Sequence, residues 1–203
     1  MSLETPADIV SYLIGRQVGD QLKTNQFPDF NLNNVTKGLQ DSMADAEMPV
    51  SEDQIKEAYE VIQKIMQAQQ EEQAAVGKKI GEDFLAANAK NDGIVTIESG
   101  LQYEVLVEGE GAKPSAESTV RVHYHGTFID GKVFDSSVER GQPAEFPVGG
   151  VIAGWTEALQ LMSEGSKWRL YIPSDLAYGA QGSQGAIPPH SALVFEVELL
   201  NVL

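Results

Sequence analysis

Two stretches carry the strongest structural signal in this chain: Val133-Phe134-Asp135-Ser136-Ser137 and Val151-Ile152-Ala153-Gly154-Trp155. They combine large apolar side chains and one carboxylate with residues that form turns. A plain hydrophobic core would instead place valine, leucine and isoleucine at the regular spacing of a strand or a helix. Apolar and aromatic side chains beside loops and a helix start are typical of a preformed pocket. The two stretches therefore predict a binding pocket in the second half of the chain.

The composition excludes several kinds of chemistry. The chain has 203 residues, no cysteine and three histidines, so disulfides, thiolate nucleophiles and cysteine-ligated metals are ruled out. No serine lies in a Gly-x-Ser-x-Gly elbow, and no phosphate-binding glycine loop is present. His123 and His125 alternate and would lie on one face of a strand, as in half of a metal site. Because further ligands are lacking, we interpret them as solvent-facing residues, and we expect neither a metal nor a cofactor.

The chain is acidic throughout, with a net charge of −16. Residues 1–93 carry 16 acids against 8 bases and residues 94–203 carry 14 against 6, so each part has a charge of −8. Such a surface repels phosphate, and we expect neither nucleic acid nor an anionic membrane as partner. No apolar run of about 18 residues predicts a membrane span. The first five residues are polar and acidic, so we expect a cytoplasmic protein, or a periplasmic one if a leader has been removed.

The first half of the chain predicts helices. Glycine and proline are sparse before Asn91-Asp92-Gly93 and frequent after it, which indicates a helical part followed by a β-rich part. Apolar residues four apart predict a first helix from Thr5 or Asp8 and a second from an Asn33 or Asn34 cap.

A third helix has the clearest boundaries. Ser51 and Gln54 form a capping box, and the helix is expected to run to Asn91, which is about 60 Å. Its glutamine-rich middle lacks an apolar stripe, so we interpret it as a solvent-exposed spacer. We therefore expect a helical domain over residues 1–70, a connecting helix over 51–91 and a second domain over 94–203. The thin helical domain favours a homodimer, and the alternative is a monomeric three-helix bundle.

The second half predicts an antiparallel sheet. Asp130-Gly131 is a hairpin signal, and a short helix is expected over 154–162. The fold class is therefore α+β, with a sheet curled over one short helix. Alternating apolar residues predict strands at 101–107, 120–124, 167–172 and 192–200.

Several ordered motifs resemble one family. The second half is similar to the FKBP family of peptidyl-prolyl cis-trans isomerases, and residues 11–15 and 37–41 resemble its dimeric, Mip-like bacterial branch. This resemblance implies an isomerase that acts on Xaa-Pro bonds during protein folding, and an intertwined helical dimer. The motifs are Val122-His-Tyr124-x-Gly126, Asp130-Gly131-x-Val-Phe134-Asp135-Ser-Ser137, Val151-Ile152-x-Gly154-Trp155, Ala177-Tyr178-Gly179, Ile187-Pro188-Pro189 and Leu193-Val-Phe195-x-Val197-Glu198-Leu199.

The resemblance also implies a set of site residues. Trp155 would form the floor beneath a proline ring, and the Ile152 N–H and the Tyr178 hydroxyl would bond the carbonyls of the bound peptide. Taken one at a time, each residue is better explained by core packing or a turn, and it is their joint pattern that favours a site. The implied catalytic residues are Tyr124, Phe134, Asp135, Trp155, Tyr178 and Phe195, and the implied substrate-binding residues are Phe146, Val151, Ile152, Ile187 and Arg140.

The chain departs from the family pattern at the expected pocket rim, at Ala144, Gly150 and Ser183. These small residues leave the expected floor intact, so they bear on substrate preference and on macrolides such as rapamycin more than on catalysis. The expected partners are Pro-containing unfolded polypeptides, macrolide inhibitors and a second copy of the chain. The alternative function is a non-catalytic dimeric chaperone or adaptor whose pocket only binds.

Overall fold

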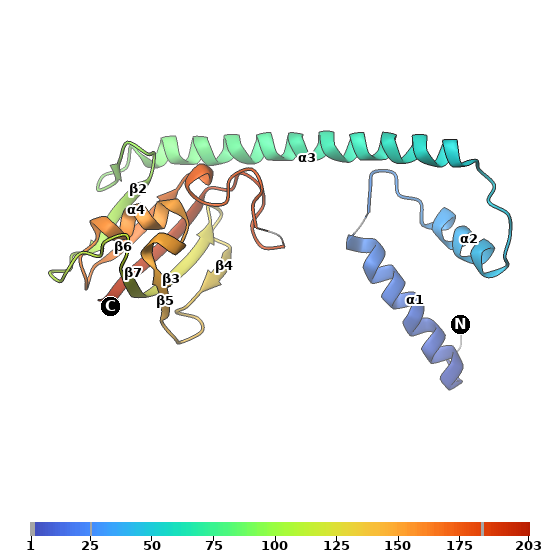
Figure 1. Cartoon of the computed structure of the whole chain (residues 1–203), viewed down its shortest axis with the longest axis horizontal. Helices are drawn as coiled ribbons and strands as arrows, with labels where there is room; N and C mark the ends of the chain where they lie inside the picture. Colours follow the sequence, from blue (N-terminus) through green and yellow to red (C-terminus); the bar gives the residue numbers. More distant parts are fainter. Residues whose placement is uncertain (1–2, 25, 184) are drawn as a thin grey trace. The chain divides into compact units, whose positions relative to one another are not determined.

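The computed structural model describes residues 3–24, 26–183 and 185–203, and contains four α-helices and a seven-stranded sheet within them (Figure 1). The chain divides into two compact units, residues 1–71 and 72–203. The first is helical and the second carries the antiparallel sheet, which confirms the predicted α+β class. The domain limits 1–70, 51–91 and 94–203 stay predictions.

The first unit holds α1 (Pro6–Thr24), α2 (Leu32–Met43) and the first turns of α3 (Glu52–Asn88). Thr5 caps α1, because its hydroxyl accepts from the Asp8 N–H at 3.1 Å while the Asp8 carboxylate accepts in return. The predicted cap of α2 is wrong: Asn31 accepts from the two N–H groups that follow it, at 2.9 and 3.2 Å. Asn33 and Asn34 already lie inside the helix, where their N–H groups need that partner.

The apolar side chains of the first unit are exposed. No residue of α1 or α2 is buried, and Val10 and Ile14, one turn apart on α1, expose 55% and 57% of their surface. Tyr59 on α3 exposes 74%. Helices with apolar stripes are normally stabilised by packing those stripes against another element. The described part of this unit leaves its stripes uncovered.

The long helix α3 begins where the sequence indicates. The Ser51 N–H donates to the Gln54 side chain at 3.0 Å, and the Ser51 hydroxyl accepts from the Gln54 N–H at 3.3 Å. The helix ends three residues earlier than expected, at Asn88. Asn88 is buried and donates to Gln102 at 2.9 Å, so the helix end packs on the sheet domain instead of continuing.

The sheet has the strand order β1-β2-β6-β7-β3-β4, with β5 paired to the other part of β3, and every pairing is antiparallel. The helix α4 (Ala153–Leu161) packs against it. The strands are β1 (Val95–Thr96), β2 (Gln102–Val107), β3 (Thr119–Phe128), β4 (Val133–Ser136), β5 (Ala144–Pro147), β6 (Lys167–Ile172) and β7 (Leu193–Val202), and two short 3-10 helices are η1 (Val148–Gly150) and η2 (Ser174–Leu176).

The core lies between α4 and one face of the sheet. Val120 and Val122 of β3 are fully buried, as their alternation predicts. Val105 and Val107 of β2 are exposed, so the alternation of the predicted strand 101–107 does not give a buried face at its end. The pairing of β2 with β6 has a register shift between these two residues. The Asp130-Gly131 hairpin joins β3 to β4, and the Gly131 N–H donates to the Phe128 carbonyl at 2.9 Å.

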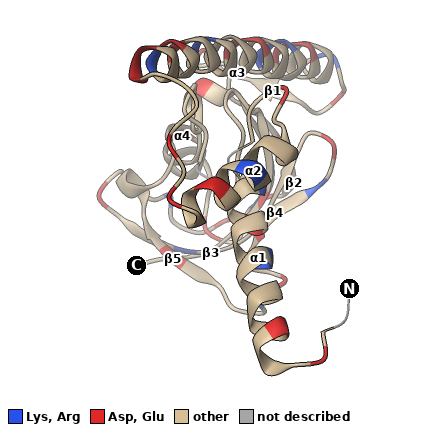
Figure 2. Ribbon diagram, turned by 90° about the vertical axis from the view of Figure 1, so that its right-hand side faces the viewer, with Lys and Arg blue, Asp and Glu red and all other residues tan. Residues whose placement is uncertain are grey.

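Acidic residues are distributed over the helices and over the loops around the sheet, as Figure 2 shows. Within the described residues, no helix has the length and apolarity needed to cross a membrane.

Candidate functional site

A cavity of about 520 Å³ lies in the second unit. This volume is within the range of ligand-binding pockets, about 300–1,000 Å³. Strands β3, β4, β5 and β7 supply residues to it, as do η1, the start of α4 and the segment after η2. The lining residues are Tyr124, Phe134, Asp135, Phe146, Gly150, Val151, Ile152, Trp155, Tyr178 and Phe195.

Trp155 is a central ring of the lining. It lies in the first turn of α4 and exposes only 4% of its surface. Three other rings meet it edge to face: Tyr124 at 5.4 Å, Phe146 at 5.9 Å and Phe195 at 5.3 Å between centroids. This arrangement is favoured by the quadrupoles of aromatic rings and holds the indole in one orientation. Its Nε1 is buried and has no hydrogen-bond partner within the described part of the chain.

A second pair of rings forms one wall. Phe134 of β4 and Phe195 of β7 meet edge to face at 5.4 Å, across β3. The β3 residue between them is Gly126, and a Cβ there would lie 2.8 Å from both rings. Only glycine leaves the space that these rings occupy.

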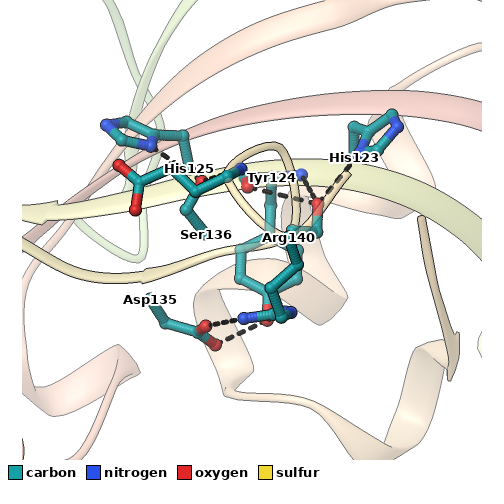
Figure 3. Close-up of polar contacts among 8 residues, drawn as sticks. His123, Tyr124, His125, Asp135, Ser136 and Arg140 are labelled. Carbon is teal, nitrogen blue, oxygen red and sulfur yellow. Dashed lines mark hydrogen bonds and ion pairs between the residues drawn. The ribbon is translucent and has the colours of Figure 1, made fainter. Parts of the chain in front are cut away.

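The polar edge of the cavity is a network of three side chains (Figure 3). The Tyr124 hydroxyl donates to Asp135 Oδ2 at 2.5 Å, and Arg140 Nη2 donates to the Tyr124 hydroxyl at 2.8 Å. Arg140 Nη1 forms a direct ion pair with Asp135 Oδ1. The Arg140 guanidinium also lies 5.6 Å from the centre of the Tyr124 ring. These contacts fix the carboxylate and the phenol at the mouth of the cavity.

The network sets the charge states at this edge. Burial alone would raise the pKa of the Asp135 carboxyl, but hydrogen bonds from Tyr124 and Arg140 together hold that pKa below its ordinary 3.8. Burial, and then the hydrogen bond to Asp135, raise the pKa of Tyr124 above 10.0. At neutral pH the edge therefore presents one carboxylate, one neutral phenol and one guanidinium.

The two strand histidines lie on the other face of the sheet. His123 Nδ1 is 3.0 Å from the Ser137 hydroxyl and His125 Nδ1 is 3.0 Å from the Ser136 hydroxyl. Tyr124 between them points toward Asp135 and Arg140 (Figure 3) and lines the cavity. In the described residues, no group of three or more potential metal ligands lies together. Neither histidine can act on a molecule in the cavity.

The structure gathers most of the expected site residues in one place. Tyr178, at the rim, exposes 39% of its surface. Arg140 does not line the cavity, and reaches the site through Asp135 and Tyr124. Ile187 is buried in the core and is absent from the lining. Of the three residues expected at the rim, Gly150 lines the cavity, whereas Ala144 and Ser183 are absent from the lining.

This arrangement is suited to binding and not to covalent chemistry. The lining has no pair of nucleophile and base, and its single ionised group is tied to Arg140 and Tyr124. Six aromatic side chains offer an apolar surface of fixed shape, and backbone and hydroxyl groups at the rim offer a few hydrogen bonds. Such a site can hold a small apolar ring and favour one conformation of it.

Comparisons with known proteins identify relatives over nearly the whole chain. A family model described as FKBP-type peptidyl-prolyl cis-trans isomerase matches residues 110–200, and a model described as the domain amino terminal to it matches residues 7–105. The chain is 47% identical to the FKBP-type 22 kDa peptidyl-prolyl cis-trans isomerase of Escherichia coli, covering 95% of this chain and 94% of the relative. The crystal structure of FkpA from Escherichia coli is similar with a TM-score of 0.76 and 36% identity, covering 99% of this chain and 98% of that one.

One comparison contradicts the expected compartment. A relative from Legionella longbeachae, 44% identical over 99% of this chain and 88% of the relative, is named outer membrane protein MIP. The prediction of a cytoplasmic protein is therefore wrong. The polar and acidic first residues on which that prediction drew do not identify a compartment.

Proposed function

The chain belongs to the family of FKBP-type peptidyl-prolyl cis-trans isomerases, and from this premise we propose that the cavity above Trp155 is its active site. The protein is a peptidyl-prolyl cis-trans isomerase that acts on Pro-containing substrates. The observation that carries the site assignment is the joint placement of four aromatic rings, Tyr178 and the Asp135 network around one cavity of ligand size.

The reaction needs no bond to break. Rotation about an Xaa-Pro amide crosses a barrier of roughly 18–20 kcal/mol because conjugation between nitrogen and carbonyl is lost midway. The twisted amide is less polar than the planar one, so water stabilises the planar ground state more. A dry aromatic cavity removes part of this extra stabilisation of the planar form and so lowers the barrier to rotation. The rings of Trp155, Phe134 and Phe195 supply such surroundings.

The remaining acceleration comes from fit to the twisted form. The proline ring rests on Trp155, and the Ile152 N–H and the Tyr178 hydroxyl donate to carbonyls of the peptide on either side of it. Only contacts that are stronger in the twisted amide than in the planar one increase the rate. If these effects together lower the barrier to rotation by about 7–8 kcal/mol, the rate of isomerisation increases by five to six orders of magnitude. Asp135 orients Tyr124 and Arg140 at the edge and transfers no proton.

The Tyr178 hydroxyl gives a direct test of this assignment. Tyr178→Phe should lower kcat/KM toward a short Xaa-Pro peptide about 10-fold, because one hydrogen bond to the peptide is worth about 1.4 kcal/mol. Tyr171→Phe is the control, since Tyr171 lies on the outer face of the sheet and packs against Phe84. Protease-coupled peptide turnover measures both. Equal rates for wild type and Tyr178→Phe would contradict the role of Tyr178.

The activity should not depend on pH near neutrality. The pKa of Asp135 is lowered from 3.8 and that of Tyr124 is raised from 10.0, so neither changes charge between about pH 5 and about pH 9. The stability that Asp135 gains from ionisation is present above its unfolded pKa and is lost only as the pH falls through the lower folded value. We expect constant kcat/KM over this range. An inflection near pH 6 or 7 would indicate a titrating catalytic group instead.

We infer further that the chain is a homodimer through α1, α2 and the start of α3. The support is the exposed apolar face of the first unit, with Val10 and Ile14 more than half exposed on α1. Because the protein is an enzyme, the alternative of a non-catalytic adaptor is not retained. Two pockets held by one dimer would bind an unfolded chain at two prolines. Macrolides such as rapamycin would compete with proline for the floor, with affinity set by the small rim residue Gly150 and its neighbours.

A further inference from the structure

The last turns of α3 belong to the isomerase unit. From residue 72 onward, every buried or half-buried residue of the helix lies on one face, at spacings of three and four: Ala74, Gly77, Gly81, Phe84, Leu85 and Asn88. A single buried stripe at this spacing is the mark of a helix packed on one surface. The spacer therefore ends as a component of the domain that contains the cavity.

Two glycines bring this helix into direct contact with the chain just before β7. A Cβ added to Gly81 would lie 3.1 Å from the Cβ of Ala192, and one added to Gly77 would lie 3.4 Å from the Pro189 carbonyl. Ala192 is itself 5% exposed. At Gly77 and Gly81 the helix therefore lies directly on residues 189–192, and at Gly81 only the Ala192 methyl group separates the two backbones.

The same segment closes the loop that carries Tyr178. The His190 N–H donates to the Gly179 carbonyl at 2.8 Å, and the Gly179 N–H donates to the Ser174 carbonyl at 2.8 Å. Residues 189–192, which rest on α3, are therefore hydrogen-bonded to Gly179, the residue directly after Tyr178. We expect a shift of residues 189–192 to act on Tyr178 through the hydrogen bond between His190 and Gly179.

The helix itself is fixed to the sheet. The Asn88 side chain donates to Gln102 at 2.9 Å, and the Gln102 side chain donates to the Leu85 carbonyl at 2.9 Å. The Phe84 ring packs against Tyr171 at 6.1 Å between centroids. Because these contacts hold α3 to β2 and β6, we expect the adjustment of a few tenths of an ångström that a Cβ at Gly81 requires to fall on residues 189–192.

We propose that Gly81 is a positioning residue for the isomerase site: the bare helix surface at Gly81 seats residues 189–192 and thereby places the Tyr178 hydroxyl at the rim of the cavity. This role rests on the proposed site. Gly81 itself does not line the cavity and touches no substrate.

Gly81→Ala in the full chain tests the proposal. Its Cβ would press on Ala192, while alanine is the better helix former, so thermal stability should not fall. We expect kcat/KM toward a short Xaa-Pro peptide to fall about 5-fold. This loss is smaller than the roughly 10-fold loss expected when Tyr178→Phe removes the hydroxyl altogether. Gly77→Ala is the matched control, because the same change one turn away meets only an ordinary contact at 3.4 Å, and it should change kcat/KM less than twofold.

Two further variants separate positioning from general damage. Ala192→Gly in the Gly81→Ala background removes the opposing Cβ and should restore activity to within twofold of Ala192→Gly alone. In a Tyr178→Phe background, Gly81→Ala should have no further effect, because the hydroxyl it displaces is gone. A full 5-fold loss in that background, or wild-type activity of Gly81→Ala, would overturn the proposal. If Tyr178→Phe alone changes nothing, the assignment of Tyr178 to the site fails first, and the positioning role fails with it.

Discussion

Replacement of Trp155 by leucine should lower kcat/KM toward a short Xaa-Pro peptide about 100-fold. Leucine remains apolar and suits the α4 helix, but it cannot form the flat floor that meets Tyr124, Phe146 and Phe195 edge to face. A loss of about 2.7 kcal/mol in the stabilisation of the twisted amide gives this factor. The substitution should also destabilise the fold by about 3 kcal/mol, because a buried tryptophan is truncated.

The second tryptophan of the chain is the matched control. Trp168 exposes 7% of its surface, against 4% for Trp155, and stacks on Tyr103 at 4.3 Å instead of lining the cavity. Trp168→Leu should cost similar stability and leave kcat/KM within about twofold of wild type. Peptide turnover at a temperature where both variants are folded separates the two effects. Equal losses of activity in the two variants would mean that Trp155 acts through stability alone.

The second large effect concerns the helical unit. Val10→Glu combined with Ile14→Glu places two charges on the exposed apolar face of α1, four residues apart. We expect the double variant to be monomeric by light scattering. Its turnover of a short peptide should be unchanged, whereas catalysis of proline-limited refolding of a protein should fall about 100-fold, because one chain no longer holds a substrate at two pockets.

A control with the same charge change isolates the apolar face. Gln69→Glu combined with Gln73→Glu, also four residues apart, lies in the exposed polar middle of α3 and should leave both the dimer and the refolding activity intact. Wild-type protein that scatters light as a monomer would contradict the dimer. A monomeric double variant with full refolding activity would contradict the advantage of two pockets.

Local signals predicted the fold well where one residue pair determines the structure. The capping box of Ser51 and Gln54 starts α3 as expected, and the alternation of Val120 and Val122 gives the buried face of β3. The cap of α2 was misplaced because three asparagines lie within four positions and only the fold selects Asn31. The strand β5 was missed altogether, because it is a strand only by its pairing with β3.

The candidate site was predicted from the resemblance more than from the residues. Tyr124 can be assigned to the core face by its spacing from Val122, but its contacts with Asp135 and Arg140 join three separate segments and are visible only in the structure. The contact of Gly81 with Ala192 spans more than one hundred residues of sequence. No local pattern distinguishes that glycine from a simple weak point in a helix.

The central claim is that proline isomerisation takes place on the Trp155 floor. In the Trp168→Leu variant, Trp155 is the single tryptophan left, so its fluorescence reports occupancy of that floor. Rapamycin is added stepwise, and emission and peptide turnover are recorded on the same samples. We predict that turnover falls in proportion to the change in emission and reaches the uncatalysed rate when emission saturates. Turnover that persists after emission has saturated would contradict the claim.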